Sequence, residues 1–291
     1  MSDPDLTAIG SAYGRVAHVL LDDPPYVLED RVSIRLADRK VLAAAQLITP
    51  DGRLSVTRED PRSKWRGIFV GRARFVEDLV VERLKTGVDQ FVILGAGLDS
   101  FAQRRPDVMS RLRVFEVDEP RTQQWKQRRL RELGMPMPAS LRFVAVDFES
   151  GASWMSELSN AGFDMARPAV VASTGVAQYI SADAMARTMQ EAASLAPMTT
   201  FVSTFMRPMH SISDAVEREL RSVTEGRAAS LGFPWISFYN PEEFIALAMA
   251  AGFDDVRHVP ASELNDRYFK DRPDGLRAPA SEDLITATRN A

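Results

Sequence analysis

The sequence lacks cysteine and contains only three histidines among its 291 residues. Without cysteine the chain cannot form a disulfide, a thiolate metal site or a cysteine nucleophile. The histidines, His18, His210 and His258, lie far apart and show no HExxH-type spacing, so we expect no metal site.

Long hydrophobic runs and a strong excess of either charge are also lacking. No apolar run approaches the roughly 20 residues that span a bilayer. The first residues, MSDPDLTAIG, have neither the basic start nor the apolar core of a secretory signal. The 36 basic and 40 acidic residues give a net charge of −4, which does not suggest a nucleic-acid partner. We therefore expect a cytoplasmic protein that binds neither membranes nor nucleic acid, and the sequence leaves its oligomeric state open.

The first part of the chain, residues 1–87, carries a helical pattern. Apolar residues at three- and four-residue spacing predict helices over residues 13–23, 30–48 and 63–85. Pro24-Pro25 and the stretch 50–52 interrupt the pattern. We expect these residues to form a helical cap on the main domain.

The pattern changes near residue 90, where short β-branched runs begin to alternate with helical stretches such as 121–133 and 182–196. Strands are expected over residues 90–97, 112–118, 141–148, 168–174, 199–205, 254–261 and 282–290. Near-continuous apolar strands separated by helices indicate a mostly parallel sheet that is covered on both faces. The prediction is an α/β, Rossmann-like domain over 88–291 with a seven-stranded sheet.

Residues 206–240 do not fit this alternation. The stretch is long for a connection within a domain, and such insertions are often lids or binding loops. It contains a charged helical segment over 215–226 and ends in four aromatic residues, Phe233, Trp235, Phe238 and Tyr239. These aromatic side chains fit a ligand cover and a small separate core equally well.

The turn Gly95-Ala96-Gly97 directly follows the first strand. Glycine allows a tight turn and a close approach of a ligand to the backbone. The backbone N–H groups at the start of a following helix favour a polar or anionic group. A tight turn without a ligand has the same pattern, so the turn alone is weak evidence.

Acidic residues close the next two strands. Asp118 lies 23 residues after Gly95, where a carboxylate commonly accepts hydrogen bonds from a ribose diol. Asp147, followed by Phe148, suits an adenine amino group beside an aromatic face, or equally a helix N-cap. This arrangement fits a nicotinamide dinucleotide or S-adenosylmethionine (SAM). Ser100 stands where the dinucleotide fingerprint has glycine or alanine, which favours SAM.

The segments GAGLDS (95–100) and FEVDEP (115–120), with a strand that ends in Asp147, resemble the leucine carboxyl methyltransferase family. That family includes bacterial SAM-dependent O-methyltransferases related to polyketide-modifying enzymes. The resemblance extends over about residues 8–290, and RARFVEDLV (72–80) resembles the family's basic segment before the first strand. It implies the Rossmann-like class I SAM methyltransferase fold and a role in secondary metabolism.

The resemblance also implies a cofactor site. Arg72 would pair with the SAM carboxylate, since its planar guanidinium binds a carboxylate through two hydrogen bonds. The turn Gly95-Ala96-Gly97 would line the methionine moiety. Asp118 would hold the ribose, and Asp147 with Phe148 would hold the adenine.

The segment ASTGVAQYI (172–180) departs from the family pattern, in which AEGLLMYL is common after the fourth strand. Thr174 stands in the place of the acid, so it can accept a hydrogen bond but adds no negative charge near the cofactor. Arg15 is the candidate for a basic residue that the family has early in its N-terminal segment.

The function expected from these residues is SAM-dependent O-methylation of a carboxylate or hydroxyl on a small molecule. A carboxylate acceptor needs no base, whereas a hydroxyl benefits from one. Three residues are candidate bases: Tyr179, Tyr239 and His210. His210 is the first choice among them because it lies in the expected lid, although a histidine in such a loop is more often a surface residue.

Two other functions are compatible with the pattern. One is a nicotinamide-dependent oxidoreductase, although Ser100 and the lack of a Tyr-x-x-x-Lys pair are unfavourable to it. The other is a non-catalytic relative that binds SAM or no ligand and acts as an interaction module, which the Thr174 departure leaves open.

Overall fold

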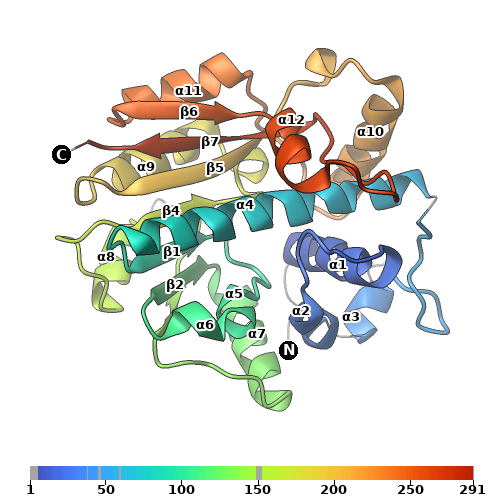
Figure 1. The fold of residues 1–291 in the computed structure, drawn as a ribbon, viewed down its shortest axis with the longest axis horizontal. Coiled ribbons are helices and arrows are strands. Elements are labelled where there is room, and N and C mark those ends of the chain that lie inside the picture. The colour runs from blue at the N-terminus through green and yellow to red at the C-terminus, as the bar shows by residue number, and fades with distance from the viewer. Residues whose placement is uncertain (1–5, 38, 45–46, 59, 149–152, 291) are drawn as a thin grey trace.

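A seven-stranded sheet lies at the centre of the computed structural model, which describes residues 6–37, 39–44, 47–58, 60–148 and 153–290 (Figure 1). Its strand order is β3-β2-β1-β4-β5-β7-β6. The strands are β1 (Gln90–Leu94), β2 (Arg113–Asp118), β3 (Leu141–Ala145), β4 (Val170–Ser173), β5 (Thr200–Met206), β6 (Asp255–Val259) and β7 (Glu282–Thr288).

Strands β1 to β5 pair in parallel, and β7 pairs antiparallel with both β5 and β6. Each of the seven strands lies within a segment predicted from the sequence, or extends at most one residue beyond it, so the mostly parallel sheet is confirmed. The carboxyl ends of β1 to β4 meet at one edge of the sheet, because parallel strands point the same way. The glycine turn, Asp118, Asp147 and Thr174 therefore lie at that edge.

Helices cover both faces of the sheet and bury two apolar cores. The first core contains residues of α4 (Arg66–Lys85), α5 (Phe101–Arg104), α6 (Pro106–Met109), α12 (Ala261–Leu264) and η5 (Asn265–Phe269). The second contains residues of α8 (Trp154–Asn160), η3 (Ala177–Tyr179), α9 (Ala182–Ala193) and α11 (Pro241–Ala250). Across the described ranges, no helix combines the length and apolar character needed to cross a membrane.

A third core joins the N-terminal helices to α7 (Pro120–Glu132). It contains apolar residues of α1 (Leu6–Leu21), α2 (Arg31–Leu36) and α3 (Arg39–Ala44), packed against Leu98 and Trp125. Figure 1 shows these helices together beside one end of α4. The predicted helical character of this part of the chain is confirmed.

The single helix predicted over 30–48 is wrong. Helix α2 ends at Leu36, because Ala37 takes an extended backbone with ψ 115°, and α3 begins at Arg39. Residues 38, 45 and 46 lie outside the described part of the chain. Ile48 forms an antiparallel bridge with Leu54 across a turn, so the apolar spacing at the end of the segment is not helical.

A buried carboxylate, Asp30, ties the N-terminal helices to the segment after β1. Its side chain accepts hydrogen bonds from Arg15 Nε at 2.8 Å, Ser33 Oγ at 2.6 Å and Ser100 Oγ at 2.7 Å. It also caps α2, since its Oδ1 accepts from the Ser33 backbone N–H at 2.9 Å. Burial alone would raise the pKa of Asp30, but the charges of Arg15 and Arg104 hold that pKa well below its usual range.

A second buried carboxylate, Asp22, joins α1 to α4. Its two oxygens contact His18 Nδ1 and Arg66 Nε, each at 2.7 Å, and Arg66 Nη2, also at 2.7 Å. Burial would raise the pKa of Asp22. The hydrogen bonds and charges of His18 and Arg66 outweigh burial and lower the pKa to about 2.

Asp22 is expected to make the stability of the protein depend on acid pH. Because its pKa is lower in the folded chain than the roughly 3.9 of an unfolded one, its contribution is complete above about pH 4 and is lost as the pH falls towards 2. Urea unfolding at several pH values should show the free-energy difference between the wild type and Asp22→Asn shrinking over this window. A difference that stays constant with pH would contradict the assignment.

Candidate functional site

The turn after β1 adopts a backbone that favours glycine. Gly95 has φ 68° and Gly97 has φ 50°, both in the left-handed region. The N–H groups of Gly95 and Ala96 donate to the Val117 carbonyl at 2.9 and 3.1 Å, which fixes the turn to the end of β2. A Cβ on Gly95 would lie 2.4 Å from Val176 Cγ2, so a larger residue would also clash.

The predicted helix after this turn is present but short. Asp99 Oδ1 accepts from the Phe101 N–H at 2.7 Å and so satisfies one donor at the start of α5. This helix has four residues. Ser100 is fully buried, and its hydroxyl donates a hydrogen bond to Asp30.

Asp118 lies at the end of β2, next to the glycine turn. Its Oδ2 accepts from the Gly97 N–H at 2.5 Å, and its Oδ1 accepts from the Glu119 N–H at 2.7 Å. These two bonds hold the carboxylate at the carboxyl edge of the sheet, where it lines a cavity.

The second acidic strand end, Asp147 with Phe148, follows β3 and lines the same cavity. Asp147 is exposed and Phe148 is half-buried. Helix α8 is capped by Ser153, whose Oγ accepts from the Met155 N–H at 3.2 Å. Ser153 rather than Asp147 therefore caps α8, and residues 149–152, which follow Phe148, lie outside the described part of the chain.

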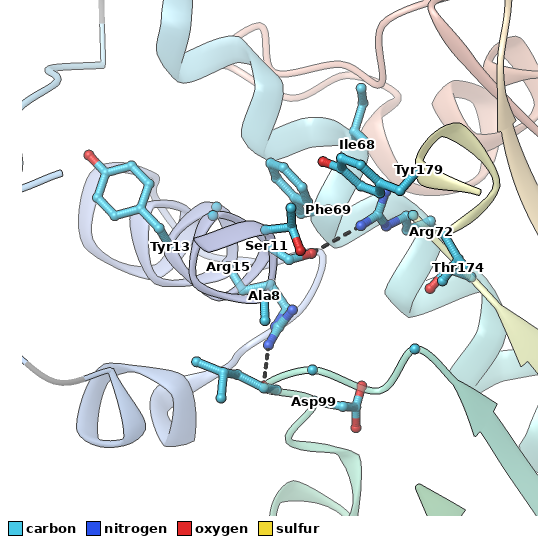
Figure 2. A pocket seen from close by; sticks show the side chains of 18 of the residues that line it. Ala8, Ser11, Tyr13, Arg15, Ile68, Phe69, Arg72, Asp99, Thr174 and Tyr179 are labelled. Carbon is cyan, nitrogen blue, oxygen red and sulfur yellow. Dashed lines mark hydrogen bonds between the residues drawn. The ribbon is translucent and has the colours of Figure 1, made fainter. Parts of the chain in front are cut away.

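Arg72 projects from α4 into the wall of the cavity (Figure 2). Its Nη1 donates to Glu282 Oε1 at 2.7 Å and its Nη2 donates to Ser11 Oγ at 3.0 Å. The guanidinium packs on Gly175, where an added Cβ would lie 2.5 Å from Nη2. Burial raises the pKa of Glu282 despite the opposing charge of Arg72.

Thr174 and Tyr179 enter the cavity wall from the segment after β4 (Figure 2). The Gly175 N–H donates to Thr204 Oγ1 at 2.7 Å, which anchors this segment to β5. Thr174 thus lies between Ser173, the last residue of β4, and the glycine on which Arg72 packs.

The cavity has a volume of about 580 Å³. Its walls come from α1, α4, the turn after β1, the ends of β2 to β4 and helix α10 (Ala215–Ser230). It brings together all the residues predicted to contact the cofactor: Arg72, Gly95, Ala96, Gly97, Asp118, Asp147, Phe148 and Thr174. Arg15 also lines it, but its Nη2 donates to the Leu98 carbonyl at 2.7 Å and its Nε to Asp30.

The three candidate bases are dispersed. Tyr179 lines the cavity, whereas His210 and Tyr239 do not. His210 is exposed on the short helix η4 (Met209–Ser211). Tyr239 packs on Phe244, with ring centroids 4.9 Å apart. The two candidates in the insertion, His210 and Tyr239, are therefore not among the residues that line the cavity.

The sequence left open whether the aromatic end of the insertion 206–240 covers a ligand or forms a small separate core, and the structure shows a part of each. Helix α10 lines the cavity with Val223, Thr224, Arg227 and Ala228, and the following residues Leu231, Phe233 and Trp235 continue the wall. Phe238 instead lies 5.0 Å from the guanidinium of Arg221, and Tyr239 joins the core around α11. Its first part covers the cavity and its last part is core.

Sequence comparison shows the family. The family model "Leucine carboxyl methyltransferase" matches residues 8–193. A protein of Bacillus subtilis is 28% identical over 293 residues, with 95% of each chain covered. One of Mycolicibacterium paratuberculosis is 30% identical over 251 residues, with 84% of this chain and 77% of the relative covered. Both carry the name "Putative S-adenosyl-L-methionine-dependent methyltransferase".

Comparison with solved structures agrees on the fold. The crystal structure of a methyltransferase candidate from Thermobifida fusca YX has a TM-score of 0.58 and 18% identity, and covers 96% of this chain and 94% of its own. The fold is thus the Rossmann-like fold of SAM-dependent methyltransferases. The chain belongs to the leucine carboxyl methyltransferase family. It is a methyltransferase, and its cofactor is SAM.

Glu282 is the contact of the site that sequence reasoning missed. It lies 210 residues from Arg72 in the chain, and β7 reaches Arg72 only because it inserts between β5 and β6. In the sequence, Glu282 is visible only as an acidic residue at the start of the last strand. Its neighbours in the chain form no motif that would have linked it to Arg72.

Proposed function

We propose that the chain methylates a carboxylate or hydroxyl oxygen of a small molecule. The supporting observation is that one cavity runs from the glycine turn and Asp118 to helix α10 and the aromatic residues that follow it. Its volume of about 580 Å³ falls in the range of roughly 300–1,000 Å³ that is typical of small-molecule sites. A cofactor at the strand ends would therefore face an acceptor in the same cavity.

The polar groups at the strand ends match the chemistry of SAM. We assign the ribose diol to Asp118, since a carboxylate accepts from two neighbouring hydroxyls. Asp147 would accept from the adenine amino group, with Phe148 against the ring. Arg72 would bind the cofactor carboxylate, and Gly95 and Gly97 line the cavity with backbone alone, which allows a ligand to approach closely.

Bound SAM supplies a methyl group that its sulfonium has already activated. The chain's contribution is to hold the acceptor oxygen in line and to exclude water. Of the three candidate bases, only Tyr179 lies in the cavity wall. That distribution favours an acceptor oxygen that needs no strong base, such as a carboxylate or an acidic phenol.

The two other functions have less support. Hydride transfer from a nicotinamide cofactor fits poorly with membership of a methyltransferase family. In addition, Ser100, at the third small position of the dinucleotide fingerprint, is committed to Asp30. A non-catalytic role has no observation in its favour, because Thr174 lines the cavity without closing it.

The test combines binding and turnover. Calorimetry should show S-adenosylhomocysteine (SAH) binding in the micromolar range and no binding of NADH. Methyl-labelled SAM should then label a carboxylic acid or phenol from a panel of acceptors. Methyl esters release methanol in mild base whereas ethers and methylamines do not, so the product also identifies the acceptor atom. A folded protein that fails to bind SAH, or that methylates only nitrogen, would refute the proposal.

A further inference from the structure

One wall of the cavity is aromatic. Trp235 lies between Trp65 and Tyr179 and meets both edge to face, with ring centroids 6.4 and 6.5 Å apart. All three line the cavity. Three aromatic rings side by side in one cavity wall offer a ligand a broad apolar contact surface.

Arg221 of α10 packs against Trp235. The Arg221 guanidinium is fully buried and lies 5.8 Å from the Trp235 ring and 5.0 Å from the Phe238 ring. Its Nε donates to Glu225 at 2.6 Å, and its Nη1 donates to the Arg207 carbonyl beyond the end of β5. The aromatic wall is thus fixed to the sheet before any ligand binds, which lowers the ordering cost of binding.

Two exposed apolar side chains also line the cavity, one on α10 and one just after it. Val223 and Leu231 line the cavity although 56% and 42% of their surfaces are exposed. Exposed large apolar side chains beside a pocket mark a place where an apolar ligand enters or extends.

The three buried arginines of the wall are already neutralised by carboxylates. Arg15 pairs with Asp30 at 2.8 Å, Arg66 with Asp22 at 2.7 Å and Arg72 with Glu282 at 2.7 Å. A ligand with several negative charges would give up its hydration on entering this cavity. The charges of these arginines, already paired with carboxylates, would not replace that hydration. These three arginines therefore offer a multiply charged acceptor no uncompensated positive charge.

From these observations we propose that the methyl acceptor is a flat, apolar aromatic acid or phenol whose ring packs against Trp235, which makes Trp235 a specificity-determining residue. This inference rests on the proposed function, because it describes the acceptor of the same reaction. The single carboxylate or phenolic oxygen would point to the strand ends, and the ring to α10.

The experiment measures acceptor binding and turnover separately from cofactor binding. Calorimetry on the SAH complex compares naphthoate, hexanoate, succinate and a short peptide that ends in leucine. Naphthoate is expected to bind at least about tenfold more tightly than the others, because a flat ring fills the aromatic wall. Methyl transfer to each acceptor is followed as kcat/KM.

Variants identify the residue responsible. Trp235→Ala should lower affinity and kcat/KM for naphthoate by about tenfold or more, mostly through KM, and leave the Kd for SAH unchanged. Trp235→Phe should keep most of the preference. Ile236→Ala is the matched control, since Ile236 is 55% exposed and does not line the cavity.

The outcomes separate the two proposals. If the folded wild-type protein does not bind SAH, the proposed function itself is refuted. If SAH binds and naphthoate does not, or if Trp235→Ala and Ile236→Ala affect naphthoate equally, the aromatic acceptor is refuted while the cofactor assignment stands. A preference for succinate or the peptide over naphthoate likewise refutes the aromatic acceptor alone.

Discussion

Replacing Asp118 with alanine is expected to weaken SAH binding by roughly 100-fold or more. A hydrogen bond to a charged group contributes about 1.5–3 kcal/mol, and the ribose diol would lose two of them. The variant also removes the acceptor of the Gly97 N–H, which lies 2.5 Å from Asp118 Oδ2, so the glycine turn loses a contact that fixes it. Calorimetry with SAH measures the change directly.

Two variants make this result specific. Glu132→Gln changes an exposed side chain of α7 that does not line the cavity, so its affinity should match the wild type. Asp118→Asn keeps one acceptor oxygen and should show an intermediate loss. Thermal unfolding checks that each variant is folded. An Asp118→Ala protein that is folded and binds SAH within about threefold of the wild type would exclude Asp118 from the ribose contact.

The sheet and the strand-end residues were predictable because their signals are local. An apolar run followed by glycine or an acid indicates both a buried parallel strand and its carboxyl end. Parallel pairing then brings together ends that are distant in the chain, such as Gly95 and Asp147. Both residues lie in the cavity wall, and their roles with the cofactor stay predictions.

Other features depend on contacts that local patterns do not contain. The helix expected over 30–48 is interrupted at Ala37, where α2 has ended with Leu36 fully buried in the N-terminal core. Its apolar spacing continues past this point, so periodicity alone could not locate the break. Glu282 contacts Arg72 only through the insertion of β7 between β5 and β6.

The candidate bases show the same limit within the insertion. The sequence favours His210 because it lies in the segment expected to cover the ligand. The segment does contribute cavity walls, but through α10 and Trp235, while His210 stays exposed before that helix. Position in a covering segment does not fix the direction of one side chain. Tyr179 reaches the cavity because η3 follows directly from the end of β4.

Asp30→Ala is expected to lower the free energy of unfolding by about 3–5 kcal/mol, because it leaves the buried guanidinium groups of Arg15 and Arg104 without their shared carboxylate. For a chain of this size the melting temperature should fall by roughly 10 °C. Urea unfolding measures the loss.

The matched control is Glu29→Ala, which removes an exposed neighbouring carboxylate paired with Arg31 and should change stability by less than about 1 kcal/mol. Equal losses in the two variants would contradict a structural role for Asp30. Because the Asp30 side chain also accepts from Ser100, which follows the glycine turn closely in the chain, the variant should weaken SAH binding as well, whereas Glu29→Ala should not.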